Sequence, residues 1–540
     1  MLRLTEIKLP IAHAEAAIRA AILERLGISE DELVDFHIAR RGHDARNKNA
    51  IYFVYTIDVR LKNEAGVRAR LAANPRIMTT PDTDYRFVAH APASLPSRPV
   101  IIGMGPCGFM AGLLLAQMGF RPIILERGKE VRQRTKDTWD LWRKHRLHPE
   151  SNVQFGEGGA GTFSDGKLYS GVKDPRHLGL KVLREFVLAG APEEILYVSK
   201  PHIGTFRLVG MVEKIRASIE SLGGEIRFES RVEDFDIVDG AIKGLTLANG
   251  EYIAANHVIL AVGHSARDTF KTIHQRGVFV EAKPFSIGFR IEHPQSLIDQ
   301  CRLGPHAGHP LLGAADYKLV HHCKNGRSVY SFCMCPGGTV VAAASEEGQV
   351  VTNGMSQYSR NERNANAAIV VGITPEKDFP EHVLAGIDLQ RQWEARAFEL
   401  GGRDYNAPAQ LVGDFLAGRP STQLGAVHPS YQPGVNLTDL ATALPDYAIT
   451  AIREALPAFD KQIKGFAMHD AVLTGVETRT SSPIRIKRDP LHYQSINTRG
   501  LYPAGEGAGY AGGILTAAID GIEVAEAVAL SMVGVAEKSR

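Results

Sequence analysis

The stretch "RPVIIGMGPCGFMAGLLLAQMGFRPIILERG", residues 98–128, decides the fold. A short apolar strand, Val100 to Ile102, runs into three glycines spaced GxGxxG, and an apolar helix-forming run and a second strand, "PIILER", follow. Gly103, Gly105 and Gly108 suit a tight turn, a close approach of the backbone to a pyrophosphate, and close packing of helix on strand. The first turn of the helix offers free N–H groups and a positive dipole. This order predicts a dinucleotide-binding βαβ unit.

The residue that ends the second strand limits the choice of dinucleotide. Glu126 stands where an acidic side chain accepts hydrogen bonds from the ribose hydroxyls, and its charge would repel a 2′-phosphate. The site therefore favours FAD or NAD. We expect Pro106, Cys107 and Arg127 to lie against the ligand with it, Cys107 mainly as a packing residue.

Two later segments favour FAD. Residues 202–266 resemble the corresponding stretch of flavoproteins built like glutathione reductase, which implies that Val232 contacts the adenine and that a return strand ends at Val262 and Gly263. The stretch "GLYPAGEGAGYAGGILTAAIDGI", 500–522, resembles the second FAD motif of that superfamily. The resemblance implies non-covalent FAD contacted by Gly505, Glu506, Gly513 and Ile514, with Glu506 standing where that motif usually has Asp.

Glycines crowd a third segment, "FGEGGAGTFSDGKLYS", residues 155–170. Linkers rarely carry residues such as Phe155 and Phe163 among their glycines, which leaves a ligand loop or an ordinary turn cluster. We assign the segment to the cofactor pyrophosphate and flavin face, through Gly159, Ala160, Gly161, Thr162, Ser164, Asp165, Gly166 and Lys167. Lys167 either tunes the flavin or sits in a salt bridge.

Four longer motifs point to one family. "SNVQFGEGGAGTFSDGKL", "FCMCPGGTVVAAASEEGQVVTNGMS" (332–356), "NANAAIVV" (364–371) and "GVETRTSSPIRI" (475–486) resemble a bacterial family of uncharacterised FAD-dependent dehydrogenases over nearly the whole chain. Disulfide reductases of the superfamily carry a cysteine pair in the glycine loop, where this chain has Phe163 and Ser164. The resemblance implies an oxidoreductase that transfers hydride at flavin N5 without a redox disulfide next to the flavin.

The pattern of elements divides the chain. We expect an α/β protein with a Rossmann-like discontinuous FAD-binding domain in two parts, 98–275 and 465–540, interrupted by a mixed β-rich substrate domain at 276–464. Residues 1–88 alternate strand and helix patterns in the order β-α-β-β-α-β, which predicts a small ferredoxin-like α+β module. The Ala-, Pro- and Ser-rich residues 89–97 read as a linker.

Candidate catalytic residues come from the inserted domain and its border. Cys333 and Cys335 form a C-x-C pair that strand alternation would turn to one face; they are redox partners, pocket residues or buried apolar groups. We expect no metal site, although His321, His322 and Cys323 lie nearby in sequence. Glu477 and Arg479 either bind a polar substrate or pair with each other. Lys167 completes the set, and no catalytic base is assigned.

Two alternative functions stay open. "AVGHSARDTF", 261–270, faintly resembles a flavin hydroxylase motif but lacks its Asp, which weakens a monooxygenase reading. The hairpin "RRGHDARNKN", 40–49, gathers Arg40, Arg41, Arg46 and Lys48, so an RNA-binding or scaffold role is the other alternative to a solvated hairpin.

The composition limits which binding partners and which cellular compartment we expect for this protein. The chain has 540 residues and a net charge of only +2, which gives no global field for nucleic acid or membranes. Five unevenly spaced cysteines, a charged N-terminus and the lack of an 18-residue apolar stretch predict a cytoplasmic protein without a membrane partner. The expected partner is a small-molecule substrate or an electron carrier, with transient NADH or NADPH as a possible donor.

Overall fold

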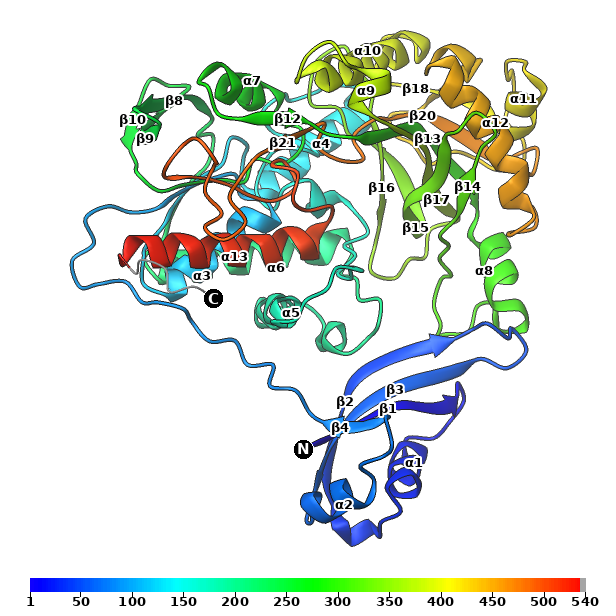
Figure 1. The fold of residues 1–540 in the computed structure, drawn as a ribbon. Coiled ribbons are helices and arrows are strands. Elements are labelled where there is room, and N and C mark those ends of the chain that lie inside the picture. The colour runs from blue at the N-terminus through cyan, green and yellow to red at the C-terminus, as the bar shows by residue number, and fades with distance from the viewer. Residues whose placement is uncertain (535–540) are drawn as a thin grey trace.

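The computed structural model describes residues 1–534, and the chain begins with a small module at the bottom of Figure 1. Its elements are β1 (Leu2–Pro10), α1 (Ala16–Leu26), η1 (Glu30–Glu32), β2 (Leu33–Asp44), β3 (Tyr52–Leu61), α2 (Glu64–Arg70) and β4 (Ile77–Thr79). Antiparallel pairs build the sheet order β2-β3-β1-β4. The module therefore has the order of elements that the sequence predicts, with its apolar strand residues packed on the two helices.

The hairpin between β2 and β3 is docked on the rest of the protein. The Arg41 N–H donates to the Tyr197 carbonyl at 2.6 Å, and Ser199 N–H donates back to the Arg41 carbonyl at 2.8 Å. The Arg41 guanidinium also lies over the rings of Phe53 and Tyr197. Arg46 pairs with Asp44 at 2.6 Å. These two basic side chains of the hairpin thus have partners within the chain, so the hairpin is not simply solvated.

The body of the protein contains a five-stranded parallel sheet of very short strands. Its order is β22 (Leu501–Pro503), β11 (Val258–Leu260), β5 (Val100–Ile102), β6 (Ile123–Leu125) and β7 (Glu225–Arg227). The three central strands are almost wholly apolar and mostly buried, as parallel strands covered on both faces must be. Strand β22 joins this sheet from the far end of the chain, so the domain is discontinuous.

Helices cover this sheet. Helix α3 (Pro106–Gln117) packs against α13 (Ile514–Met532), and near them lie α5 (Leu178–Leu188) and α6 (Thr205–Ser221) (Figure 1). A separate three-stranded sheet within residues 202–266 consists of β8 (Val232–Val238), β9 (Ala241–Leu247) and β10 (Tyr252–Ala254). The remaining elements of this part are α4 (Val131–Lys144), η2 (Ala160–Phe163), η3 (Glu193–Leu196) and α7 (Arg267–Gln275).

An eight-stranded mixed sheet makes the other half of the body. Its main path is β14 (Val320–His322), β15 (Ser328–Ala342), β17 (Asn364–Ile373), β13 (Phe285–Pro294), β20 (Val472–Glu477), β18 (Ala407–Leu411) and β19 (Val435–Leu437), and β16 (Thr352–Ser356) pairs with β15. Around it lie α8 (Gln295–Leu303), η4 (Gly304–His306), α9 (Pro375–Asp378), α10 (Ala385–Leu400), α11 (Val412–Ala417), η5 (Leu440–Thr442) and α12 (Asp446–Asp460).

The position of β20 corrects one sequence-based boundary. The division at residue 464 assigned Val472–Glu477 to the second FAD segment, but β20 pairs with β13 and β18 inside the eight-stranded sheet. All six of its residues are buried there. A separate pair, β12 (Val280–Ala282) with β21 (Ile484–Ile486), lies beside the crossing points between the two halves. The chain therefore leaves the inserted sheet only after Glu477.

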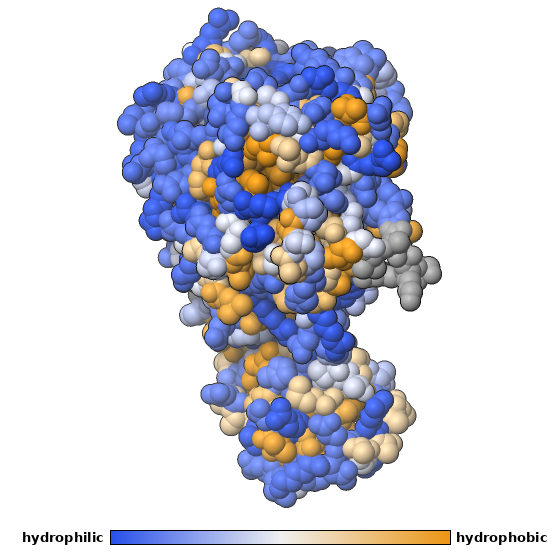
Figure 2. All heavy atoms as spheres, turned by 90° about the vertical axis from the view of Figure 1, so that its left-hand side faces the viewer, coloured by the Kyte–Doolittle hydropathy of each residue, from blue (hydrophilic) through white to orange (hydrophobic). Residues whose placement is uncertain are grey.

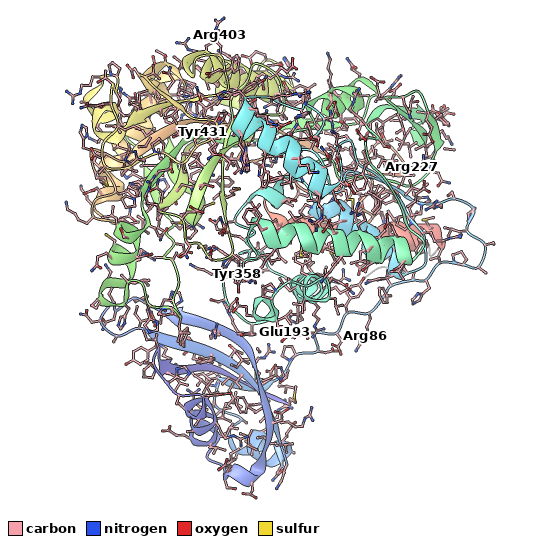
Figure 3. The ribbon with its side chains drawn as sticks, turned by 180° about the vertical axis from the view of Figure 1, so that it is seen from behind. Arg86, Glu193, Arg227, Tyr358, Arg403 and Tyr431 are labelled. Atoms are coloured by element: carbon pink, nitrogen blue, oxygen red, sulfur yellow. The ribbon has the colours of Figure 1, made fainter. Side chains whose placement is uncertain are left out.

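Figures 2 and 3 show the two lobes from other sides. In Figure 2 a mostly hydrophilic surface, with apolar patches, covers a large upper body that narrows to the smaller N-terminal module. Figure 3 shows Tyr358 and Glu193 on the side of the body that faces this module. Among residues 1–534, no helix combines the length and the apolar character that crossing a membrane requires.

Candidate functional site

A cavity of about 530 Å³ lies at the carboxyl edge of the parallel sheet. Ile102, Leu125 and Ala261, which end or directly follow three of its strands, line one wall, and residues of the inserted sheet line the opposite wall. Open parallel sheets bind their ligands at this edge, and the volume is in the range of ordinary ligand sites.

The three glycines of the GxGxxG turn meet three different demands. Gly103 has φ +100°, and a Cβ there would lie 2.4 Å from the Ala261 carbonyl oxygen. A Cβ on Gly108 would lie 1.9 Å from the Gly103 oxygen, so this glycine lets α3 pack on the turn. A Cβ on Gly105 would meet only the Gly159 Cα, at 3.6 Å, and Gly105 lines the cavity. Gly103 and Gly108 serve the fold, and Gly105 keeps space open for a ligand.

Two helices begin at the cavity. Pro106 and Cys107 of α3 and Ile514 to Ala517 of α13 line it, so both positive helix ends face the same space. Gly512 and Gly513 precede α13, and among the described residues nothing lies within 4 Å of a Cβ placed on either. The geometry suits a ligand with negative charge between the two helices.

Glu126 is buried beside the glycine turn. Its carboxylate accepts hydrogen bonds from the backbone N–H groups of Met104 at 2.9 Å, Gly128 at 2.8 Å and Gly156 at 3.0 Å. The sequence predicts a ribose-binding role for Glu126. The structure shows in addition that the same carboxylate ties the glycine turn to the start of the 155–170 segment.

The 155–170 segment is folded against the turn and is not a linker. The Gly158 N–H donates to the Met104 carbonyl at 2.8 Å, and a Cβ on Gly159 would lie 2.8 Å from the Gly105 Cα. Below the segment, the fully buried Arg134 of α4 donates to the carbonyl groups of Asn152, Val153 and Glu157 at 2.7 to 2.8 Å. Sequence reasoning missed Arg134, because only the folded chain shows which carbonyl groups it reaches.

Asp165 and Lys167 are held by the inserted domain. Asp165 accepts a hydrogen bond from Arg360 Nε at 2.9 Å, and the Lys167 ammonium donates to the Met334 carbonyl and lies 3.9 Å from Asp165. Burial would raise the pKa of Asp165, but Arg360 and Lys167 outweigh it and keep the pKa below its ordinary value. Both side chains line the cavity as charged groups. Lys167 sits in a charge cluster, which is one of its two expected roles.

The 500–522 motif brings a Glu506–His264 contact and an unpartnered atom to the cavity. Glu506 lies 3.2 Å from His264 Nδ1. His264 Nε2 is buried and has no hydrogen-bond partner within residues 1–534, although His264 lines the cavity. Behind them, Asp520 accepts the Gly505 N–H at 2.7 Å and pairs with Arg488. A buried polar atom without a partner is uncommon and points to a ligand group at this place.

Glu477 and Arg479 reach the cavity but do not pair with each other, which excludes one of the two alternatives that the sequence left open. Glu477 accepts from Arg290 at 2.9 Å and from the Thr352 hydroxyl at 3.0 Å. Arg479 donates to Glu394 at 2.8 and 3.0 Å and to Ser345 at 2.6 Å. Each charge therefore has its own buried partner, because the two side chains leave β20 and the segment after it toward different neighbours.

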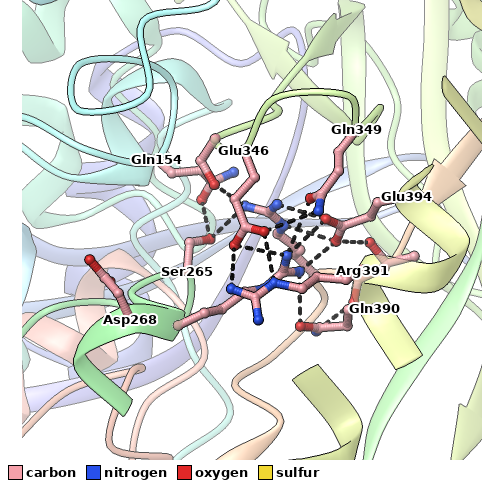
Figure 4. A network of polar contacts seen from close by, with 12 residues as sticks. Gln154, Ser265, Asp268, Glu346, Gln349, Gln390, Arg391 and Glu394 are labelled. Carbon is pink, nitrogen blue, oxygen red and sulfur yellow. Dashed lines mark hydrogen bonds and ion pairs between the residues drawn. The ribbon is translucent and has the colours of Figure 1, made fainter. Parts of the chain in front are cut away.

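The Arg479 pair belongs to a network that joins the two halves of the body (Figure 4). Arg267 at the start of α7 donates to Glu394 of α10 at 2.6 and 3.0 Å. Burial would raise the pKa of Glu394, but Arg267 and Arg479 lower it to about 2. Ser265 donates to Gln154 at 3.0 Å and accepts from Arg479. The network fixes the wall of the cavity across the domain border.

Cys333 and Cys335 are close, but not by simple alternation along a strand. The register of β15 against β17 shifts between Phe332 and Cys335, and Cys333 has φ +44°. Cys333 lines the cavity, whereas Cys335 and Met334 are buried and do not line it. A bulge, which adds a residue to one strand, breaks the alternation that the sequence assumes.

The cavity brings together most of the predicted residues. Those that line it are Gly103, Gly105, Pro106, Cys107, Glu126, Arg127, Gly159, Ala160, Gly161, Ser164, Asp165, Gly166, Lys167, Val232, Val262, Gly263, Cys333, Glu477, Arg479, Gly505, Glu506, Gly513 and Ile514. Gly108, Thr162 and Cys335 lie behind its walls. Residues that line it without having been predicted include Gln154, Arg231, His264, Thr352, Asn353 and Thr516. They lie within the segments that carry the motifs, but a motif does not show which of its side chains face the cavity.

One metal-like group lies away from the cavity. His321, Cys323 and Glu454 bring possible ligand atoms within 4.8 Å of one another, and His321 Nε2 is 3.2 Å from Glu454. Sequence reasoning considered His321 and Cys323 with the C-x-C pair, but the structure places them against α12 instead.

Comparison with known proteins gives one relative along almost the whole chain. An uncharacterized protein of Clostridium beijerinckii is 46% identical over 526 residues, which cover 97% of this chain and 98% of that protein. Residues 284–480 match the family described as "FAD-dependent protein, C-terminal domain-like", and residues 1–60 match a domain of unknown function.

Solved structures show a more distant likeness. A flavoprotein/dehydrogenase from Cytophaga hutchinsonii is 11% identical, with a TM-score of 0.36 over 82% of this chain and 80% of that one. The E. coli quinol fumarate reductase is 12% identical, with a TM-score of 0.36 over 82% of this chain and 71% of that one.

Proposed function

Since this chain belongs to the same family as the Clostridium beijerinckii protein and FAD is its cofactor, we propose that it is an oxidoreductase that exchanges hydride between a small molecule and flavin N5. The observation that carries the proposal is the meeting of two helix N-termini, the glycine turn and the 155–170 segment around one cavity whose far wall comes from the inserted sheet. A Rossmann-like FAD-binding domain is the fold that this arrangement supports.

The residues around the cavity fit FAD. Gly105, Gly512 and Gly513 leave room that a side chain would fill, and His264 Nε2 has no partner among the described residues. We assign the adenosine end to Glu126 and Val232, the pyrophosphate to the GxGxxG turn, and the ribityl chain to Glu506.

The inserted sheet forms the substrate side of the site. When bound, FAD supplies the two-electron hydride chemistry that side chains lack. We assign the substrate side to Thr352, Asn353 and Glu477, which line the cavity together with the positively charged Lys167. Arg290 pairs with Glu477, and Glu394 pairs with Arg479, so both cavity side chains are held in place. The wall therefore orients a substrate with little movement of its own side chains.

The proposal predicts that purified protein is yellow and releases FAD, not FMN, on denaturation. Anaerobic addition of NADH or NADPH should then bleach the flavin absorbance with one donor faster than with the other, and reoxidation by O₂ should be followed with and without candidate substrates. A colourless preparation that cannot be reconstituted with FAD would refute the proposal. Rapid peroxide release without a product would indicate an oxidase in place of a dehydrogenase.

A further inference from the structure

The two thiols of the C-x-C pair form a compact unit at the cavity wall. Cys333 lines the cavity at the bulge of β15, and Cys335 lies behind it, fully buried. The Cys335 thiol donates to the Cys333 carbonyl at 3.4 Å, so the two cysteines are in direct contact. The positive φ of Cys333, +44°, is a conformation that residues other than glycine seldom adopt, and such residues cluster at functional sites.

Two cations flank the pair. The Lys167 ammonium donates to the Met334 carbonyl between the two cysteines, and Arg290 Nη1 donates to the Cys333 carbonyl at 3.0 Å. Glu477, the acidic group that faces Arg290, is already paired with it. The neighbouring Cys335 thiol lowers the pKa of Cys333 to about 6 against the effect of burial, and Lys167 and Arg290 add to the lowering. The Cys333 thiol and burial raise the pKa of Cys335 well above its ordinary value.

This asymmetry is what a dithiol redox centre requires. The thiol that faces the cavity is the one whose pKa is lowered, which favours the reactive thiolate form, and the thiol behind it has a raised pKa, which favours the protonated form. Each cation also has an acidic partner, Asp165 for Lys167 and Glu477 for Arg290, so the two positive charges are held in place beside the pair. The wall that carries the pair also faces the cavity that we assign to FAD.

We propose that Cys333 and Cys335 form a reversible disulfide that exchanges two electrons with the bound FAD, an inference that rests on the proposed function. In the oxidising direction the Cys333 thiolate and the Cys335 thiol form one S–S bond. Two electrons and the Cys335 proton pass together to oxidised FAD, which becomes the reduced anion, so charge and hydrogen balance.

The pair lies on the inserted sheet and not on the glycine loop. The sequence predicts no redox disulfide next to the flavin, because Phe163 and Ser164 stand where related reductases carry cysteines. The inference revises that expectation: the loop lacks a dithiol, and the opposite wall of the cavity supplies one.

The test is an anaerobic titration of FAD-loaded protein with dithionite, after oxidation with diamide and removal of the reagent. Wild type should take up about four electrons per FAD, and Cys333→Ser and Cys335→Ser about two each, since each couple holds two electrons. Cys301→Ser, which removes a half-buried thiol near the Lys464 carbonyl, is the matched control and should titrate like wild type.

A second measurement needs neither flavin nor turnover. Oxidised protein, with or without FAD, is treated with N-ethylmaleimide and then digested. The mass of the peptide that contains Cys333 and Cys335 is measured by mass spectrometry. We expect that peptide to escape alkylation in wild type and to accept two labels after reduction. Thermal denaturation of each variant checks that it is folded.

The outcomes separate the two proposals. A wild-type protein that binds FAD but takes up only about two electrons overturns the dithiol centre and leaves the flavin function standing. A disulfide that forms without adding to the electron count overturns it equally, as do variants that titrate like wild type. If the preparation binds no FAD at all, the proposed function fails, while the peptide masses still report on the disulfide.

Discussion

At the scale of single residues, the site is built from buried charges that each have a named partner. Asp165 has Arg360, Glu477 has Arg290, and Arg134 is satisfied by backbone carbonyl groups. A buried charge is costly unless it is paired or hydrogen-bonded. These partners explain why so polar a cavity wall is compatible with a folded core. Removing one partner should therefore lower the stability of the folded protein.

Glu126→Gln tests the residue that joins the glycine turn to the 155–170 segment. An amide offers one acceptor oxygen where three backbone N–H groups now donate to a carboxylate, and its own NH₂ group faces those donors. We expect a loss of about 2–3 kcal/mol in stability and at least about tenfold weaker FAD binding. Thermal denaturation of apoprotein and flavin fluorescence titration measure the two effects.

Glu251→Gln is the control for that variant. Glu251 is half-exposed and pairs with Arg227 at 2.7 Å, so its loss should change stability by less than about 1 kcal/mol. If Glu126→Gln behaves like this surface variant in both measurements, the role assigned to Glu126 is wrong.

At the scale of elements, the site depends on the order strand, glycine turn, helix. The sequence predicts β5, α3 and β6 closely, because three buried apolar residues, a GxGxxG spacing and a long apolar run are local signals. Helix α13 and strand β22 follow from a second local motif. The bulge in β15 has no such signal, since it depends on pairing with β17.

Gly105→Ala and Gly108→Ala test two different roles of glycine within one turn. Gly105 leaves space for the ligand, and Gly108 allows close packing of the helix on the turn. A methyl group at Gly105 meets no protein atom closer than 3.6 Å, so the apoprotein should keep its melting temperature while FAD affinity falls about 100-fold, or about 3 kcal/mol. A methyl group at Gly108 would lie 1.9 Å from the Gly103 oxygen. That variant should lose about 1–3 kcal/mol or more in stability before any ligand is added.

Melting curves of the two apoproteins and their FAD titrations check this contrast. A Gly105→Ala protein that binds FAD like wild type would show that the cofactor does not approach this turn.

At the scale of the whole molecule, contacts between lobes define the site. The Arg267, Glu394 and Arg479 network crosses from the FAD-binding half to the inserted sheet (Figure 4). The hairpin of the N-terminal module lies against residues 197–199 on the body. The substrate wall therefore has its position because separate units pack together.

Glu394→Gln should weaken the protein and remove part of its acid sensitivity. The variant leaves two buried arginines short of a counter-charge, at a cost of about 3–5 kcal/mol. In wild type the pKa of Glu394 is about 2 when folded and 4.5 ordinarily, so its stabilisation, about 3 kcal/mol, is complete above pH 4.5. It is lost as pH falls from about 4.5 toward 2.

Urea unfolding at pH 7 and at lower pH values measures this effect. Glu281→Gln, at a half-buried residue paired with Lys487 at 3.4 Å, serves as the control. A Glu394→Gln protein whose free energy of unfolding keeps the wild-type slope against pH below pH 4.5 would contradict the assignment.

The sequence by itself determined the parts of this protein that rest on local patterns. The βαβ unit, the flavin motifs and the order of the N-terminal module follow from periodicity, glycine spacing and short turns, in which neighbouring residues decide the backbone. Most of the residues assigned to the cofactor from these motifs line a single cavity.

Only the tertiary structure decided which charged groups pair and which strand joins which sheet. Arg360 meets Asp165 across 195 positions, Glu394 meets Arg479 across 85, and β20 enters the inserted sheet past the expected boundary. The same holds for the bulge that turns Cys333 to the cavity. These features depend on contacts between residues far apart in the chain, whose identity local patterning does not encode.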